Sequence, residues 1–313
     1  MVEALFTLIV FPGFLFLGAA GVLAEFTDRK LYARLQNRQG PPWFQPVADF
    51  VKLASKEDIV PAKANHFMFK LVPMLAVTAA TVPIMYIPIW SSQALFSFSG
   101  DMIVVIYLLT VPTLSFFLGG WFSTSLYSMI GALRTLTQLF AYEVPLFLAL
   151  LAPAVIAGTW SLSEMSLFYA EHPLLILTNL LGLAVALISI QGKLERTPFD
   201  IPEAETEIVG GTFTEYSGRL LALFRMSIDI ELVVCCSIVA AVFLPFGLNL
   251  GSAVGFVLYV AKVAFVLFLL ALMRTVLARF RIEQMVVFCW KYLAPAAFLQ
   301  LLISVLVRGW VNP

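Results

Sequence analysis

The stretch Gly192–Arg219, GKLERTPFDIPEAETEIVGGTFTEYSGR, is the most polar interruption in the second half of a strongly apolar chain. Two prolines, Pro198 and Pro202, stand near its start, and the pair Gly210–Gly211 would end a helix that begins at Glu203. The stretch carries six carboxylates: Glu195, Asp200, Glu203, Glu205, Glu207 and Glu215. A polar segment of this kind between two apolar runs predicts a loop that joins two membrane spans.

The spacing of these acids leaves two interpretations open. If residues 201–209 are helical, Asp200, Glu203 and Glu207 lie on one face and repel by a few tenths of a kcal/mol per pair when exposed. In a partly dry site, the same repulsion raises some pKa values and lets the cluster hold and pass protons. The alternative is a solvated acidic loop.

Composition places the chain in a membrane. Hydrophobic residues make up 61% of it and charged residues 12%, which is too apolar for a soluble domain of this length. The sequence predicts an all-α integral membrane protein, a single membrane domain over residues 1–313, with about eight transmembrane helices and amphipathic cytoplasmic segments. The predicted spans are Leu5–Ala24, Leu71–Trp90, Met102–Trp121, Leu139–Gly158, Leu174–Ile190, Leu220–Phe243, Val254–Met273 and Met285–Val307.

Basic residues predict the orientation. Eight spans put both termini on one side, and the loops alternate in Lys and Arg content. Segments 25–70, 122–138, 191–219 and 274–284 hold eight, one, three and three bases, whereas segments 91–101, 159–173 and 244–253 hold none. The positive-inside rule then places the four basic segments in the cytoplasm and both termini outside the cell membrane.

The sequence also predicts what this chain does not carry. Its 19 bases and 19 acids form no basic patch with stacking aromatics, so nucleic acid is not an expected partner. Its three cysteines lie inside apolar runs without a CxxC pair, and its two histidines stand apart. Iron–sulfur and nickel–iron centres need sets of thiolates, so we expect buried spacer thiols and no metal site in this chain.

Charged residues inside the predicted spans are candidates for function, because such groups are costly at membrane depth. Glu143, about a turn into the fourth span, suits proton handling or a structural partner for an Arg. Lys262, in the middle of the seventh span, needs a carboxylate or water, or it extends toward the interface. Arg225 and Asp229 are spaced for an i, i+4 ion pair, and Glu231 needs a different partner.

The first cytoplasmic segment, NRQGPPWFQPVADFVKLASKED at Asn37–Asp58, becomes amphipathic after its Gly-Pro-Pro turn. An apolar stripe is predicted from Val47, Phe50, Val51 and Ala54, with polar residues on the other faces. The segment suits a helix at the membrane surface, a docking platform for a soluble partner, or both.

Four segments resemble those of one family in order and spacing. They are QPVADFVKLASKE (residues 45–57), GALRTLTQLFAYEV (131–144), PFDIPEAETEIVGG (198–211) with TEYSGR after it, and RTVLARFRIEQMVVFCWKYLAP (274–295). They are similar to the signatures of the subunit 1/H family of respiratory complex I, whose close relatives include the anchor subunits of membrane-bound [NiFe] hydrogenases.

The resemblance implies an eight-span subunit beside the junction with a peripheral arm. Its expected partners are iron–sulfur and hydrogenase-like large and small subunits, antiporter-like membrane subunits and the lipid bilayer. Iron–sulfur clusters, with a nickel–iron centre in the hydrogenase branch, would belong to those partners. The implied residues, with Lys262 added from its position, are coupling groups Glu143, Asp200, Glu203, Glu205, Glu207, Glu215 and Lys262; counter-charges Arg134, Arg274 and Arg279; and docking residues Arg38, Gln45, Asp49, Lys52, Lys56 and Glu57.

One departure favours a branch of the family. The quinone-reducing members have a longer insertion between the first Gly-Pro and the Gln-Pro, whereas Gly40–Pro41 here reaches Gln45–Pro46 through three residues. That short form resembles the hydrogenases and their sulfur-reducing relatives. The leading hypothesis is a non-redox anchor and coupling subunit. The alternatives are a quinone-cavity subunit, with a cavity between 38–57 and 198–215, and a stand-alone transporter, for which an internal repeat is lacking.

Overall fold

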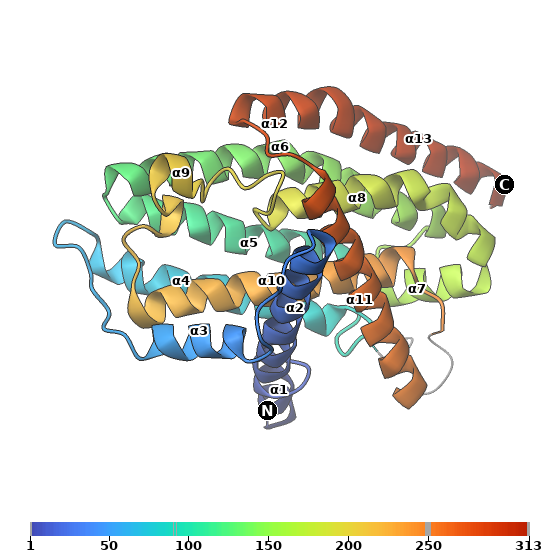
Figure 1. Ribbon diagram of the computed structural model, residues 1–313. Helices are drawn as coiled ribbons and strands as arrows, with labels where there is room; N and C mark the ends of the chain where they lie inside the picture. The colour runs from blue at the N-terminus through green and yellow to red at the C-terminus, as the bar shows by residue number, and fades with distance from the viewer. Residues whose placement is uncertain (1, 90, 92, 248–251, 312–313) are drawn as a thin grey trace.

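The computed structural model describes residues 2–89, 91, 93–247 and 252–311, and over these residues it is built of helices and loops (Figure 1). The helices are α1 Val2–Ile9, α2 Phe14–Leu35, α3 Gln45–Ala54, α4 His66–Thr81 with a 3-10 turn at Val82–Tyr86, α5 Asp101–Phe122, α6 Leu126–Ala157, α7 Leu162–Glu171, a 3-10 segment Pro173–Asn179 leading into α8 Leu180–Lys193, α9 Glu205–Ile208, a 3-10 turn Gly211–Phe213, α10 Gly218–Phe243, α11 Ser252–Val276, α12 Ile282–Phe288, a π-helical turn Cys289–Leu293 and α13 Ala294–Val311.

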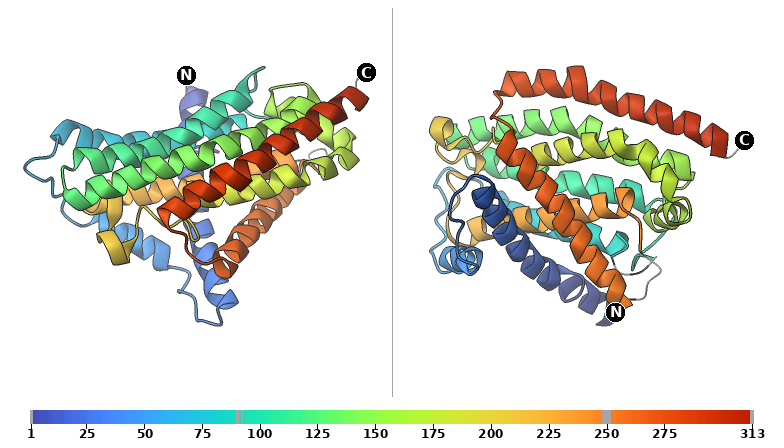
Figure 2. Two further views of the ribbon diagram at one scale, coloured as in Figure 1. Left: turned by 90° about the horizontal axis from the view of Figure 1, so that it is seen from above. Right: turned by 45° about the vertical axis from the view of Figure 1, so that its right-hand side comes forward.

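Eight helical stretches within the described residues are long and apolar enough to cross a membrane, which confirms the predicted fold class. Helix α4 packs on α5 and α10, and α6 packs on α5, α8 and α13, so these helices lie side by side in Figure 1. Helices α2 and α11 contact each other and cross the rest at a steep angle (Figure 2). Helix α10 is the most deeply buried of the eight, because neighbours cover it on several sides.

The connections gather at two opposite ends of the bundle. The start of α4, the turn between α5 and α6, α9 and the start of α10 lie at one end (Figure 1). Helix α7 and the C-terminal end of α13 lie at the other. This arrangement agrees with the alternation of basic and base-free loops along the sequence.

Two helices extend well beyond their predicted spans. Helix α2 continues past Ala24 to Leu35, and α6 begins at Leu126 rather than Leu139. Apolar runs mark the length that crosses hydrocarbon and not the helix ends, and the i, i+4 pair of Glu25 with Arg29, 2.5 Å apart, suits a helical continuation. Glu143 therefore lies in the middle of a helix instead of one turn from its start.

The helix predicted over residues 201–209 is wrong: only Glu205–Ile208 forms the short α9. Residues 200–204 are irregular because Pro202 interrupts the run, and each nearby acid pairs with an arginine from a different helix. The shared acidic face therefore does not form.

The end of the acidic loop packs closely on α6. A side chain at Gly131 would place its Cβ 2.5 Å from the backbone nitrogen of Thr212, and Ser128 donates to the Thr212 carbonyl at 2.9 Å. At Gly211, φ is +56° and a Cβ would lie 1.9 Å from the Pro202 carbonyl oxygen. Glycine at both positions thus lets the loop fold back beside α6.

Helix α3 is amphipathic, but its apolar stripe is divided. Val47 and Val51 are exposed, whereas Phe50 lines a cavity between α3 and the bundle. Pro46 near the N-terminus of α3 suits a helix start, since its missing N–H costs nothing there. The helix therefore covers the cavity with one face and presents another outward.

Candidate functional site

A cavity of 510 Å³ lies among α2, α3, α10 and the acidic loop. Thirteen of its 23 lining residues are charged, which is far from the apolar lining typical of organic ligand pockets. The charged ones are Glu25, Asp49, Glu195, Asp200, Glu203, Asp229, Glu231, Arg29, Lys52, Lys193, Arg196, Arg225 and Arg274. Such a lining favours water and ions.

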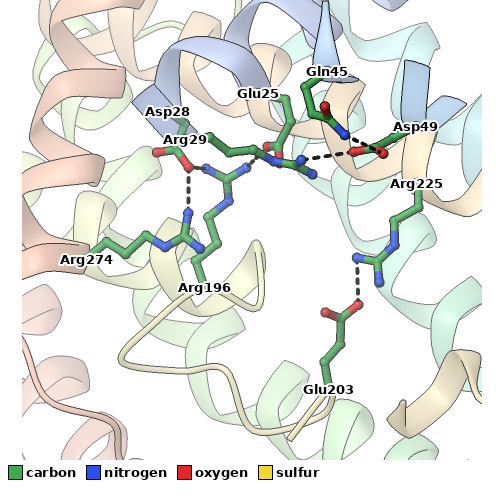
Figure 3. Close-up of polar contacts among 9 residues, drawn as sticks. All are labelled: Glu25, Asp28, Arg29, Gln45, Asp49, Arg196, Glu203, Arg225 and Arg274. Carbon is green, nitrogen blue, oxygen red and sulfur yellow. Dashed lines mark hydrogen bonds and ion pairs between the residues drawn. The ribbon is translucent and has the colours of Figure 1, made fainter. Parts of the chain in front are cut away.

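Ion pairs of alternating sign run along one wall of this cavity (Figure 3). At the inner end, Arg274 from α11 contacts the Asp28 carboxylate at 2.7 Å. The same carboxylate contacts Arg196 at 2.6 Å, and Arg196 contacts Glu25 at 2.7 Å. Three segments far apart in sequence are therefore joined at this point through one arginine.

The outer end of the same series reaches α3. Glu25 contacts Arg29 at 2.5 Å, Arg29 contacts Asp49 at 3.3 Å, and Asp49 contacts Lys52 at 3.3 Å. Hydrogen bonds and charges from Lys52 and Arg29 outweigh burial and lower the pKa of Asp49. The seven residues from Lys52 to Arg274 are called the charge ladder below.

Burial distinguishes the two ends of the charge ladder. Arg196 is 9% exposed and Asp28 1%, whereas Lys52 is on the surface. Burial acts to lower the pKa of Arg196, but the carboxylates of Asp28 and Glu25 raise it more, so the guanidinium stays charged. A buried arginine between two carboxylates is held by pairing that water cannot replace.

Glu195 behaves differently from its neighbours in sequence. Burial raises its pKa well above the ordinary value, and the negative charges of Glu203 and Glu231 raise it further. One carboxylate oxygen of Glu195 lacks a hydrogen-bond partner among the described residues. This carboxyl therefore holds a proton at a pH where an exposed glutamate is ionised.

The innermost charges are a fully buried pair. Lys193, the last residue of α8, contacts Glu231 of α10 at 2.7 Å, and both side chains are 1% exposed. The Lys193 ammonium also donates to the backbone carbonyl of Leu109 on α5. Glu231 does have a partner other than Arg225, as its position on α10 predicted.

Two of the predicted coupling acids line the cavity. Asp200 contacts Arg279 at 3.4 Å, and Glu203 contacts Arg225 at 3.1 Å. The predicted pairing of Arg225 with Asp229 is wrong, because Arg225 turns to the loop carboxylate instead. Helical spacing permitted the local pair, but the loop brings a second carboxylate within reach.

The other acids of the loop lie elsewhere. Glu207 is 59% exposed and contacts Arg134 at 2.6 Å, and this hydrogen bond lowers its pKa. Arg134 also donates to the Ile201 carbonyl, which ties the loop to α6. Glu215 is half-buried and is not among the cavity-lining residues, and the side chain of Glu205 lies outside the described residues.

Glu143 and Lys262 lie outside the cavity lining. Glu143 is half-buried on α6, and among the described residues it has neither a hydrogen bond nor an ion pair. Lys262 is buried, donates to the Phe246 carbonyl and lies 4.6 Å from the Phe246 ring centroid. A backbone carbonyl and an aromatic face thus meet the need for a partner that its sequence position indicated.

The predicted docking residues divide in the same way. Gln45 donates to Asp49 at 3.1 Å, and Asp49 and Lys52 both line the mouth of the cavity. Arg38, Lys56 and Glu57 are exposed beyond that lining. All of these residues lie on α3 or beside it.

Sequence reasoning missed the most buried part of the site. Glu25, Asp28 and Arg29 were treated as the beginning of a loop, and Lys193 and Arg196 as loop bases that report orientation. The available signal was their spacing: acids and a base at i, i+3 and i+4 directly after an apolar run stay on one helical face.

The cysteines are free and buried, as predicted. In the part of the chain that the structure describes, no group of three or more His, Cys, Asp or Glu side chains is arranged to hold a metal ion. The charged cavity is therefore the candidate functional site.

Comparisons with known proteins agree with this architecture. The family model described as NADH dehydrogenase matches residues 6–305. Subunit 8 of the NADH-quinone oxidoreductase of Thermus thermophilus is 37% identical, over 92% of this chain and 84% of the relative. The corresponding subunit of the NADH-quinone oxidoreductase of Thermomicrobium roseum is 35% identical, over 93% of this chain and 92% of the relative.

A solved structure is similar over nearly the whole fold. A chain of the membrane-bound sulfane sulfur reductase, an archaeal respiratory membrane complex, superposes with a TM-score of 0.85 at 26% identity. The match covers 97% of this chain and 100% of that one. The sequence and structural matches together establish that this protein is a membrane subunit of the NADH dehydrogenase subunit 1/H family.

Proposed function

We propose that this membrane subunit is a non-redox anchor that couples electron transfer in a peripheral arm to the transport of H⁺ or Na⁺. The observation that carries the proposal is the charge-lined cavity, which opens beside α3 and reaches the buried Lys193–Glu231 pair. Buried, paired charges of this kind can respond to a charge change at the mouth by shifting protons farther inside.

The coupling would begin at the mouth of the cavity. A peripheral arm resting on α3 would lie against Asp49 and Lys52, the outer members of the charge ladder. Reduction chemistry in the arm would change the charge there, and Asp200 and Glu203 on the loop would respond with it. Glu143 is our candidate for the next acid inward, and antiporter-like membrane subunits are the proposed receivers.

Partners and cofactors follow from the relatives. We assign iron–sulfur clusters, and in a hydrogenase-type complex a nickel–iron centre, to peripheral large and small subunits. The orientation we propose has both termini outside and the α3 face in the cytoplasm, because the basic segments gather there. The short connection before Gln45 favours a hydrogenase or sulfur-reducing complex over a quinone-reducing one.

Quinone reduction is the second candidate, and one observation favours it. The cavity lies between segments 38–57 and 198–215, where a quinone headgroup would be expected, and its volume is within the range of ligand pockets. Its thirteen charged lining residues weigh against an isoprenoid tail, because burying charges beside hydrocarbon is costly. A photoreactive quinone that labels α3 or the loop in the native complex would favour quinone reduction.

The coupling proposal is tested with Glu143→Gln. The variant complex should carry out electron transfer in the arm at close to the wild-type rate, while ion uptake into inverted membrane vesicles is abolished. Glu207→Gln is the matched control, since that carboxylate is 59% exposed and outside the cavity lining. Equal loss of electron transfer and ion uptake in Glu143→Gln would count against a coupling role.

The identity of the complex is tested by its composition. The native assembly would be purified in mild detergent, its subunits identified and its nickel measured. Nickel with hydrogen evolution would support the hydrogenase type, and iron–sulfur subunits without nickel would support sulfur or quinone reduction. A chain that purified by itself would contradict the anchor role.

A further inference from the structure

Lys193 occupies the innermost position of the cavity. It closes α8, its side chain is 1% exposed, and its ammonium contacts the equally buried Glu231 at 2.7 Å. Both residues belong to the cavity lining, so the pair is where the cavity's chain of charges ends. A second contact, to the Leu109 carbonyl, brings the ammonium against α5.

Helix α6 lies against the same end of α8. Gln138 donates to the Gly192 carbonyl at 2.7 Å, and a Cβ added at Gly192 would lie 3.4 Å from the Tyr142 side chain. The Tyr142 hydroxyl in turn is 3.1 Å from the Thr113 hydroxyl on α5. Lys193 is therefore enclosed by three helices, with polar groups on the side away from the cavity.

Glu143 follows Tyr142 on α6 and is the acid that Lys193 can address from that side. The positive charge of Lys193 acts on the Glu143 carboxyl, and it is the one charged side chain that does so among the described residues. Lys193 thus interacts with Glu231, which lines the cavity, and with Glu143, which does not. It is the basic group between the two acids.

Lysine has the chemistry that such a position requires. Its amine can gain and lose a proton when it is buried, and its four-carbon stem is flexible. Arginine has the same charge but is not deprotonated in proteins. A buried cation that serves only to neutralise Glu231 could be either residue, whereas a proton carrier must be the lysine.

We propose that Lys193 carries protons from Glu231 to Glu143 and so joins the cavity to the interior of the bundle. A proton arriving from the cavity neutralises the Glu231 carboxylate and weakens its hold on the ammonium. Lys193 then gives one proton to the Glu143 carboxylate, leaving a neutral amine and a carboxylic acid. The amine takes the proton from Glu231, which restores the original pair and leaves one proton on Glu143.

This inference rests on the proposed coupling function and adds a residue that the coupling requires. Lys193→Arg tests it directly, because the charge opposite Glu231 is kept while proton release is lost. In inverted vesicles we expect proton uptake per electron transferred to fall about a hundredfold, the lower part of the range for a positioned acid–base group. Complex content and arm electron transfer should stay close to wild type. Wild-type uptake in this variant would overturn the relay.

A second variant separates the relay from simple charge neutralisation. Lys193→Met with Glu231→Gln removes both charges at similar volume, which buried ion pairs often tolerate. A purely structural pair predicts that assembly and proton uptake are both kept. The relay predicts that the complex assembles with uptake lost. If Lys193→Arg does not assemble, this double variant decides between the two.

Glu143→Gln, measured in parallel, distinguishes failure of this inference from failure of the proposed function. Loss of uptake in Glu143→Gln with normal uptake in the Lys193 variants would overturn the relay and leave the coupling role standing. Normal uptake in all three variants would overturn both. Loss of uptake in all three, with arm electron transfer kept, supports both.

Discussion

The two halves of segment 192–219 use their charges in opposite ways. Its beginning supplies Lys193 and Arg196, which are 1% and 9% exposed and join α2 and α10 through ion pairs. Its later part supplies Glu207 and Arg219, which are 59% and 72% exposed and pair at the surface. Charge density along the sequence is similar in both halves, so burial decides which charges matter.

The physical reason is the environment around each pair. Water screens an exposed ion pair, whose contribution to stability is about 0–1 kcal/mol. A buried pair gains little overall, but removing one partner leaves an uncompensated charge and costs about 3–5 kcal/mol. The buried half should therefore be sensitive to single substitutions and the exposed half tolerant of them.

The largest effect is expected from Arg196→Met. Without the guanidinium, Asp28 and Glu25 lose a shared partner in a buried site, and we expect a loss of about 3–5 kcal/mol in stability. The melting temperature of the purified complex and its content in membranes would report this. Arg219→Met is the matched control and should cost about 1 kcal/mol or less. Equal losses in the two variants would contradict the comparison.

A pH-dependent effect is expected from Glu195→Gln. The folded protein keeps the Glu195 proton because burial and the charges of Glu203 and Glu231 raise its pKa, whereas the unfolded chain releases it above about 4.5. The folded state then binds more protons, so wild-type stability falls as pH rises above that value.

Glu195→Gln removes this dependence. The variant should gain in melting temperature relative to wild type between pH 5 and pH 8, and the gain should be smallest at the acid end. A constant difference over this range would show that Glu195 does not hold its proton in the folded state.

An intermediate effect is expected at the outer end of the charge ladder. Asp49→Asn with Lys52→Met removes a pair at the mouth of the cavity, and we expect weaker retention of peripheral-arm subunits with little change in the stability of the membrane part. Subunit composition after purification at moderate salt measures this. Glu164→Gln on α7, at the opposite end, is the control (Figure 1). Unchanged composition in the double variant would remove the docking role.

The smallest effect is expected from Glu207→Gln. Arg134 lowers the pKa of Glu207, so the pair contributes above the ordinary pKa of the carboxyl and its contribution disappears as pH falls. Because the carboxylate is exposed, the change should be about 0.5 kcal/mol or less. Thermal melting at pH 7 and pH 4 would detect a larger effect, which would place Glu207 in the functional site after all.

The sequence predicted the membrane fold but not its helix ends. Runs of about twenty apolar residues identify spans because only a helix satisfies its own backbone in lipid. They do not indicate where a helix continues into a polar environment, so the last part of α2 and the first part of α6 were missed. Those extensions carry Glu25, Asp28 and Arg134 into the structure.

By itself, the sequence determined the fold class, the family and the docking helix α3, because hydrophobic runs, motif spacing and amphipathic periodicity are properties of local sequence. Only the tertiary structure decided which charges meet. Arg196 joins Asp28 and Glu25, and Lys193 joins Glu231, because packing of α2, α8 and α10 brings them together. Those contacts span long distances in sequence, and the energy of an ion pair depends on burial that no local pattern encodes.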